Sequence, residues 1–371
     1  HNSRYCICSS SIRIKMAPNE LLFRSLGNNN GKHNDFEGAP DVSYKKKQGI
    51  FNLGVHEVSM EFREPFIVSG YRKPYVSAWE CFVSLLTRCN ESVNVWSHIL
   101  ATILFNFCYC KVFLFEHNPL KDSFVYPLLA FAIAVSAMFV MSSGAHLFNS
   151  MSPRIRHICF FFDYAAISTY SFTAGQIFFF YSRPQSSNLA ILTNSSLFLG
   201  ISASLSFVTT SLCCASRHRW RRYKHVIRTV SFALTWFLNT FPYTWRLASC
   251  ANQFECHTIS KPFFMRQIWC FAIAAVFNAF KVPERWIPRV FDFFGQSHHF
   301  LHILCAIGAA DDFTAVLLDM KGRRQVLDEG IVTISNSLGL MALVMAGNIV
   351  IVLLFARTLG ENHEEEHHKD S

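Results

Sequence analysis

Three histidines and one aspartate lie in long apolar stretches, where ionisable side chains are rare and usually mark a functional site. His298 and His302 are four residues apart in "SHHFLH" (297–302), so they share one face of a helix. His146 lies near the end of the apolar stretch 124–148, and Asp163 lies in the next apolar stretch. Because burying an imidazole without a partner is costly, these side chains are expected to share a ligand.

Three imidazoles with one open position form the ligand set of a catalytic zinc site, so we predict that His146, His298 and His302 bind zinc. Zinc lowers the pKa of a bound water to about 7, which makes hydroxide available at neutral pH. In such a site Asp163 would act as the base or orient the water, and Ser142, one turn before His146, would hydrogen-bond the water or a substrate carbonyl. Two alternatives stay open: histidines that face lipid headgroups, and a structural metal site that hydrolyses nothing.

The composition indicates a membrane protein. Of 371 residues, 51% are hydrophobic and only 16% are charged, and residues 124–148 and 331–356 contain no formal charge. Either stretch can cross a hydrocarbon core of about 30 Å at about 1.5 Å per residue. We therefore predict an all-α integral membrane protein, a seven-transmembrane-helix bundle with an eighth C-terminal transmembrane helix. The eight predicted spans are 96–115, 124–148, 158–181, 188–213, 226–247, 264–280, 299–319 and 331–356.

The predicted organisation has five parts. Residues 1–75 are polar and expected to be disordered, and residues 96–320 form the seven-helix core. Residues 331–356 form the eighth span, and residues 357–371 form a polar tail. Residues 76–95 are predicted to form an amphipathic helix that lies on the membrane surface or packs on protein. Its apolar residues at helical spacing are Trp79, Phe82, Val83 and Leu86.

Topology predicts that the candidate site residues converge. The second predicted span ends, the third begins and the seventh begins on the same side of the membrane, so all four ionisable side chains lie near one surface. The distribution of Lys and Arg in the loops favours a cytoplasmic N-terminus, which makes that side cytoplasmic. Much of this bias comes from the basic residues of 217–228, which either attract anionic lipid headgroups or only flank a span.

Several separated motifs resemble the progestin and adipoQ receptor family. They are "SGYRKP" (69–74), "NESVNVWSH" (90–98), the S-x3-H of Ser142 and His146, Asp163, and "SHHFLH" (297–302). The resemblance extends from about residue 57 to 325, and "AVLLDMKGRR" (315–324) with the eighth span resembles the membrane progestin receptor branch.

The resemblance implies a seven-helix core with zinc held by His146, His298 and His302 on the cytoplasmic side, and Asp163 and Ser142 match the family's carboxylate and serine beside the metal. It also implies binding of a progestin-like steroid at the plasma membrane and signalling to G proteins or lipid second messengers. The family is similar to a wider hydrolase superfamily that includes alkaline ceramidases.

Two positions depart from the family pattern. His299 follows His298 where the family more often has Gln, and we expect it to be an interfacial residue. Asp311 and Asp312 lie about 20 Å along the same helix from His298, and we expect this acidic pair to be solvated at the outer interface. The alternative is a tilted or deeper helix, in which the pair faces the internal cavity and alters which ligand fits.

Three polar residues at the start of the first span, Asn90, Glu91 and Asn94, are expected to tie the surface helix to that span by capping and hydrogen bonds. His98, inside the first span, is expected to be a packing histidine with satisfied hydrogen bonds rather than a fourth metal ligand.

Two functional hypotheses remain, and a third is weaker. The first is a multi-pass receptor for a steroid or similar lipid, and the alternative is a zinc-dependent lipid amidase whose product carries the signal. A membrane scaffold is weaker because it gives no reason for convergent histidines beside an acid and a serine. We expect membrane lipids as further partners and no nucleic acid.

Overall fold

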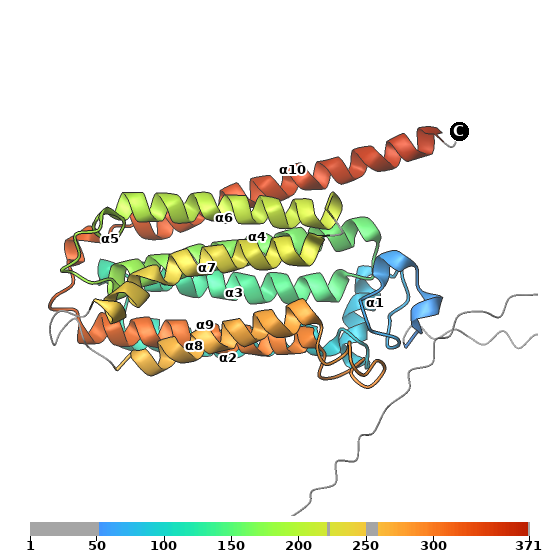
Figure 1. Ribbon diagram of the computed structural model, residues 1–371, viewed down its shortest axis with the longest axis horizontal. Coiled ribbons are helices and arrows are strands. Elements are labelled where there is room, and N and C mark those ends of the chain that lie inside the picture. Colours follow the sequence, from blue (N-terminus) through green and yellow to red (C-terminus); the bar gives the residue numbers. More distant parts are fainter. Residues whose placement is uncertain (1–51, 221–222, 250–258, 370–371) are drawn as a thin grey trace, which may run out of the picture. The chain divides into compact units, whose positions relative to one another are not determined.

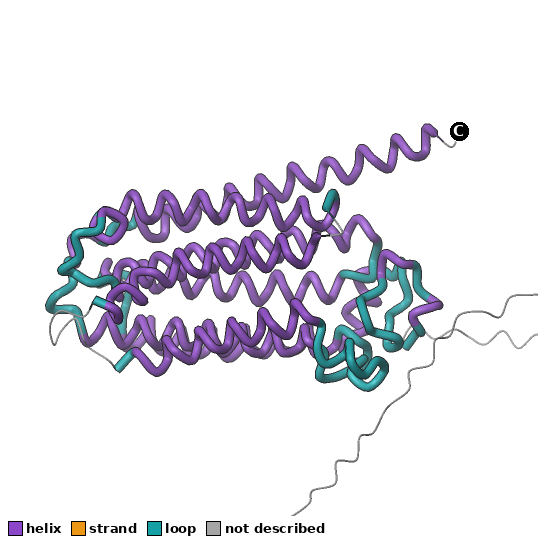
Figure 2. Tube along the Cα trace, in the orientation of Figure 1, coloured by secondary structure: helices purple, strands orange, loops and turns teal. Residues whose placement is uncertain are grey.

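The protein is described by a computed structural model that covers residues 52–220, 223–249 and 259–369. Within these residues the chain forms helices joined by loops, with one isolated pair of extended residues, Leu53 and Tyr71 (Figures 1 and 2). The prediction of an all-α protein is confirmed. Most of the N-terminal region that we predict to be disordered lies outside the described residues.

Each of the eight predicted spans overlaps one long helix. These helices are α2 (Ser92–Lys111), α3 (Tyr126–Phe148), α4 (Pro153–Ile177), α6 (Ser195–His218), α7 (Lys224–Ala248), α8 (Lys261–Phe280), α9 (Ser297–Gly322) and α10 (Leu340–Lys369). Single π-helical turns extend α2 and α4 and precede α10, at Val112–Glu116, Phe178–Ser182 and Ser335–Gly339. Two short helices complete the set, α1 (Ala78–Val83) and α5 (Ala190–Thr193). Helix α10 continues through residues 357–369, which we placed in a polar tail.

Six of the described helices are long and apolar enough to cross a membrane, namely α2, α3, α6, α8, α9 and α10. This makes the chain a multi-pass membrane protein. Helices α4 and α7 are as long but carry more polar residues, so the count of seven or eight spans stays a prediction. The polar residues of α4 point into protein: Asp163, Ser168, Thr173 and Gln176 are all buried.

Helix α4 packs closely against α7 through a small residue. A Cβ on Gly175 would lie 2.4 Å from Oδ1 of Asn239, so only glycine permits this approach. The Asn239 amide then donates to the Ser171 carbonyl of α4 at 2.7 Å, and its Oδ1 accepts from Ser202 of α6 at 2.7 Å. A hydrogen-bonded asparagine therefore joins three helices in the interior of the bundle.

Contacts between helices bring three helix ends together. Helix α2 packs against both α3 and α9, and α9 also packs against α8. The start of α2, the end of α3 and the start of α9 consequently lie at one end of the bundle, beside α1 (Figure 1). We call this the histidine end and the other the opposite end.

Residues 52–75 are ordered, which corrects our prediction of disorder up to residue 75. Leu53, Val58, Ile67 and Tyr71 gather into a small apolar cluster, and Leu53 and Tyr71 exchange two backbone hydrogen bonds of 2.8 and 3.0 Å. The carboxylate of Asp292 accepts the backbone N–H groups of Val68 and Ser69. Composition indicates disorder because these apolar residues are scattered among polar ones.

Arg72 joins this segment to the end of α3. Its buried guanidinium donates to the carbonyls of His146 at 2.6 Å and Leu147 at 2.7 Å, and to Oδ1 of Asn149 at 2.6 Å. Carbonyls in the last turn of a helix lack partners within the helix, and a cation is favourable there. Arg72 therefore fixes the helix end that carries His146.

The surface helix that we predict at 76–95 is shorter than expected. The helical part is α1 and a following 3-10 turn, Ser84–Leu86. Trp79 and Leu86 are exposed, whereas Cys81 is buried. The exposed apolar side is the one that we predict to face a membrane surface.

The opposite end contains a buried ion pair. Arg246 of α7 donates to Oδ2 of Asp319 of α9 at 2.8 Å, and both side chains are fully buried. Ser260 and Ser182 donate to the same carboxylate at 2.6 and 2.7 Å. The carboxylate of Asp319 is hydrogen-bonded on both oxygens and joins α7 to α9, whereas Nε and Nη1 of Arg246 have no hydrogen-bond partner among the described residues.

A second ion pair at the opposite end is partly exposed. Arg324 donates to Oδ2 of Asp122 at 2.6 Å and also pairs with Glu329. This hydrogen bond from Arg324 lowers the pKa of the Asp122 carboxyl below its ordinary value. Oδ1 of Asp122 also accepts the Phe124 backbone N–H and caps a helical turn.

Candidate metal centre

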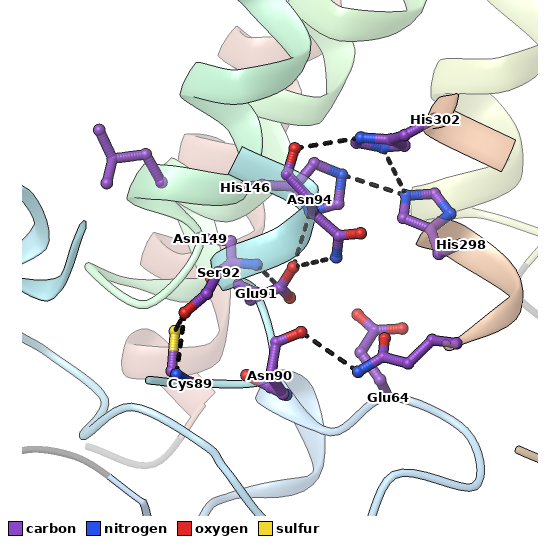
Figure 3. Close-up of polar contacts among 12 residues, drawn as sticks. Glu64, Cys89, Asn90, Glu91, Ser92, Asn94, His146, Asn149, His298 and His302 are labelled. Atoms are coloured by element: carbon purple, nitrogen blue, oxygen red, sulfur yellow. Dashed lines mark hydrogen bonds and ion pairs between the residues drawn. The ribbon is translucent and has the colours of Figure 1, made fainter. Parts of the chain in front are cut away.

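The three predicted ligands come together at the histidine end, from two helices. Nε2 of His298 lies 3.1 Å from Nε2 of His146 and 3.2 Å from Nε2 of His302 (Figure 3). One nitrogen from each ring lies within 4.8 Å of the other two. His146 and His302 are buried, and their rings come from the last turn of α3 and the second turn of α9.

The other nitrogens of two rings have acceptors that fix their protons. Nδ1 of His146 lies 2.8 Å from Oε2 of Glu91, and Nδ1 of His302 lies 3.1 Å from the Asn94 carbonyl oxygen (Figure 3). Because a carboxylate or carbonyl oxygen only accepts, both Nδ1 atoms must carry hydrogen. Their Nε2 atoms then present lone pairs to the space between the three rings.

This arrangement has too many acceptors for hydrogen bonding alone. His298 can donate one N–H from Nε2, and it faces the lone pairs of both His146 and His302 at similar distances. A cation in the centre would satisfy all three nitrogens at once. Ligating histidines usually donate their other N–H to a carboxylate or carbonyl, as two of these do. The residues therefore fit a metal, and a set of three imidazoles suits zinc.

Glu91 is central to the surroundings of the three histidines. Its Oε2 also accepts from the Asn94 amide at 2.7 Å, and its Oε1 accepts from the Asn149 amide at 2.8 Å (Figure 3). The carboxylate is buried and directly precedes α2. A charged acceptor with several donors holds the His146 ring in one tautomer and one orientation.

Our interpretation of Glu91 as a linking residue at the start of a span was incomplete, because it missed the contact with His146. The signal available in the sequence was a carboxylate at the start of a span that begins on the same side as the candidate ligands. Asn149 was not singled out at all, since it lies outside every predicted span.

His98 packs on the site without ligating it. Its ring stacks on the His302 ring with centroids 3.9 Å apart, and the predicted packing role is consistent with this contact. However, neither ring nitrogen has a hydrogen-bond partner among the described residues, so the expectation of satisfied hydrogen bonds was wrong. The Ser97 hydroxyl, one residue earlier, lies 3.3 Å from Nδ1 of His302.

Asp163 and Ser142 lie next to the three histidines, and both are buried. Ser142 lies one turn before His146 on α3, and its hydroxyl is a hydrogen-bonding neighbour of the Asp163 carboxyl group. Its Oδ1 has no hydrogen-bond partner in the described part of the chain. A cavity of about 220 Å³ opens here, and Asp163, His146 and His298 line it. A carboxylate oxygen without a partner is therefore available to a ligand in that cavity.

His299 is not interfacial as we expected but buried. Its Nδ1 accepts the backbone N–H groups of Gly295 at 3.0 Å and Gln296 at 3.2 Å. The side chain turns back onto the loop before α9, because those N–H groups have no partner within the helix. His299 therefore holds the start of the helix that carries His298 and His302.

Asp311 and Asp312 are also buried, which contradicts our expectation of a solvated pair. Arg266 of α8 donates to Oδ2 of Asp311 at 2.7 Å, and Tyr170 of α4 donates to Oδ2 of Asp312 at 2.9 Å. Partners from neighbouring helices make the burial of these two carboxyl groups tolerable. The sequence of α9 alone does not reveal these partners on α8 and α4, so it could not predict that the acidic pair is buried.

Comparison with known proteins decides the family. The family model described as haemolysin-III related matches residues 86–312. The chain is 33% identical over 319 residues to membrane progestin receptor delta of Homo sapiens, and the match covers 83% of this chain and 90% of that protein. The chain belongs to the haemolysin-III-related family.

Other members have similar names. Membrane progestin receptor gamma-B of Danio rerio is 30% identical over 340 residues, which cover 86% of this chain and 96% of that protein. Membrane progestin receptor gamma of Homo sapiens is 26% identical over 307 residues, which cover 82% and 90%. The predicted resemblance to the progestin and adipoQ receptor family, nearest its membrane progestin receptor branch, is confirmed. Membership supports a multi-pass membrane receptor, and the matched range contains all five candidate site residues.

Proposed function

We propose that this haemolysin-III-related protein is a receptor that binds a steroid or similar lipid and holds a zinc ion at His146, His298 and His302. The observation that carries the metal is the convergence of three Nε2 atoms, two of them on rings whose Nδ1 atoms have fixed acceptors. The relatives named as membrane progestin receptors support the steroid class. The proposed orientation has a cytoplasmic N-terminus at the plasma membrane, which makes the histidine end cytoplasmic.

Zinc, when bound, would supply a Lewis acid and connect α3 to α9. The residues around it have separate tasks. Glu91 holds the His146 ring, and the Asn94 carbonyl holds the His302 ring, so each presents Nε2. Asp163 directs an unpartnered carboxylate oxygen toward the cavity beside the three histidines, which is separate from the groove proposed below for the steroid.

An apolar groove beside the metal centre suits the body of a steroid. It measures about 560 Å³ and lies between α2 and α9, within the range of 300–1,000 Å³ typical of small-molecule sites. Its walls include Trp96, Leu100 and Ala306. Ser97 also lines it and lies 3.3 Å from Nδ1 of His302, so the groove passes the side of the His302 ring that does not face the other two histidines.

Steroid binding is tested by saturable binding of labelled progesterone to zinc-loaded protein in nanodiscs. The variant Ala306→Phe fills the groove and is expected to weaken binding at least about tenfold, because a steroid cannot share that space. The matched control is Ala272→Phe on an exposed part of α8, which should bind as the wild type does. Equal binding by Ala306→Phe and Ala272→Phe would place the steroid elsewhere, and absence of saturable binding by the wild type would refute the receptor proposal.

The alternative of a zinc-dependent lipid amidase is not favoured, since the relatives carry receptor names. It retains one supporting observation, the unpartnered oxygen of Asp163 beside the three histidines. Asp163→Asn separates the two hypotheses. A receptor keeps its zinc and its steroid binding in this variant, whereas an amidase keeps zinc and loses ceramide hydrolysis by orders of magnitude. Coupling to G proteins or lipid second messengers belongs to the same proposal and is measured as a steroid-dependent response in cells.

A further inference from the structure

A second cluster of side chains lies in the cavity at the histidine end, and the proposed receptor function does not use it. Besides His146 and His298, the cavity is lined by basic residues from the ends of three helices. Arg217 belongs to the last turn of α6, and Lys224 and Arg228 lie in the first two turns of α7. Lys281 directly follows α8. We call Arg217, Lys224, Arg228 and Lys281 the basic cluster.

None of the four forms an ion pair with a carboxylate among the residues that the structure describes. Arg217 donates to Nδ1 of His157 and to the Tyr164 hydroxyl, at 3.2 and 3.1 Å. Arg228 donates from Nε to the Ser216 hydroxyl at 3.0 Å. These acceptors are neutral, so neither guanidinium group has a direct anionic partner, although the carboxylates of Glu61, Glu64, Glu91, Asp163 and Glu284 line the same cavity.

One donor of the basic cluster has no acceptor. Nη2 of Arg228 is buried and lacks a hydrogen-bond partner in the described ranges. A buried charged donor without a partner is costly, and an acceptor that enters the cavity would remove this cost. By contrast, Arg156 in the same cavity forms a direct ion pair with Glu64.

The charges of the cluster disfavour one another. Burial lowers the pKa of Lys224, Glu64 in the same cavity raises it, and the nearby Arg228, Arg217 and Lys281 lower it. Lys224 also begins α7, where the backbone N–H groups already create a positive potential. Lysine and arginine at the start of a helix are therefore unfavourable unless an anion lies against them.

We propose that the basic cluster is a binding site for a phosphate group, with Lys224 and Arg228 as its main ligands and Arg217 and Lys281 beside them. A phosphate is favoured over a carboxylate ligand because it accepts several charge-assisted hydrogen bonds at once, which suits cationic donors that come from three helices. The backbone N–H groups at the start of α7 add donors of the kind that bind phosphate.

The phosphate has two possible sources with the same chemistry. A phosphomonoester lipid headgroup would reach the cavity from the membrane surface, and a free phosphate would reach it from solution. The site is independent of zinc, because its ligands are separate from the three histidines. Failure of the steroid receptor proposal would consequently leave this proposal intact, and the reverse also holds.

The test measures binding of two probes to full-length protein in phosphatidylcholine nanodiscs. One probe is labelled phosphatidic acid added to the discs, and the other is labelled inorganic phosphate in solution. The test variant is Lys224→Gln/Arg228→Gln. The matched control is Arg154→Gln/Arg219→Gln, which removes two exposed cations that do not line the cavity. Gel filtration and thermal unfolding show whether each variant is folded.

The wild type is expected to bind one probe saturably, and Lys224→Gln/Arg228→Gln to weaken that binding at least about tenfold. The affinity of the control should stay within about twofold of the wild type, and Lys224→Arg/Arg228→Lys should bind more tightly than Lys224→Gln/Arg228→Gln because it keeps both charges. Binding of phosphatidic acid alone assigns the lipid source, and binding of inorganic phosphate assigns the free source. Absence of saturable binding by the wild type, or an equal loss in the control, overturns the proposal. If the test variant does not fold, Lys281→Gln alone must still weaken binding, and an unchanged affinity there overturns it as well.

Discussion

Replacing Glu91 by Gln is the most informative single change near the metal centre. The carboxylate accepts Nδ1–H of His146 at 2.8 Å and two amide N–H donors, from Asn94 and Asn149. Glutamine keeps nearly the same shape but has one acceptor oxygen and an NH2 group. The variant therefore loses the charge and leaves at least one of the three donors facing another donor.

The expected loss of zinc affinity can be estimated from these contacts. A hydrogen bond to a charged acceptor contributes about 1.5–3 kcal/mol and one to a neutral acceptor about 0.5–1.5 kcal/mol, so the exchange costs about 1–1.5 kcal/mol at His146 alone. The unpaired amide donor adds to this cost. Loss of a partner of a ligating histidine typically lowers metal affinity by about 10–100-fold. We expect Glu91→Gln to weaken zinc binding by that factor, at about 1.4 kcal/mol per tenfold.

The assay is chelator competition on purified protein, which gives the zinc dissociation constant of each variant. The matched control is Glu284→Gln: Glu284 is equally buried, lines the same cavity and accepts from Ser297, but does not contact the three histidines. The control should keep wild-type affinity within about threefold. A wild-type zinc affinity in Glu91→Gln, or an equal loss in both variants, would refute this reasoning.

Three further changes test the fold. Arg246→Met leaves the fully buried carboxylate of Asp319 without its cation. The variant should lose about 3–5 kcal/mol of unfolding free energy and show a much lower thermal midpoint, and an unchanged midpoint would contradict the buried ion pair. Gly175→Ala forces a Cβ against Asn239 of α7 and should lower the free energy of chemical unfolding by about 1–3 kcal/mol. The control Gly200→Ala, with open space around it, should be neutral or slightly stabilising. Equal effects of the two variants would contradict the close packing of α4 on α7. Asp122→Asn keeps the cap but loses the partly exposed ion pair, worth about 0–1 kcal/mol. Because the folded-state pKa of this carboxyl lies below its ordinary value near 3.8, that stabilisation is present above pH of about 4 and is lost as the pH falls. The midpoint difference from wild type should be constant from about pH 5 to 8 and vanish at lower pH, and a difference that grows on acidification contradicts the assignment.

The long apolar stretches predict the helices well, because hydrophobic length is read directly from the sequence. Helices α4 and α7 are not among the helices that are apolar enough to cross a membrane by composition. Their polar residues have partners on other helices, such as Asn239 with Ser171 and Ser202. Composition counts these residues as polar and has no information about their partners.

The convergence of the three histidines was predictable from topology, since the helix ends that carry them lie on one side. The role of Glu91 was not, because its contact with His146 joins residues far apart in the chain. The same reason applies to the order of residues 52–75 and to the burial of Asp311, whose partners belong to other segments. His299 differs, because its partners are the backbone N–H groups just before its own helix.

The most direct test of the metal centre is the zinc content of protein purified without chelators. The measurement compares elemental analysis of the wild type with His298→Ala/His302→Ala, and gel filtration confirms that both are folded. We predict one zinc per wild-type chain and none in the variant. Wild-type protein without zinc, or a variant that keeps it, would contradict the assignment of His146, His298 and His302 as ligands.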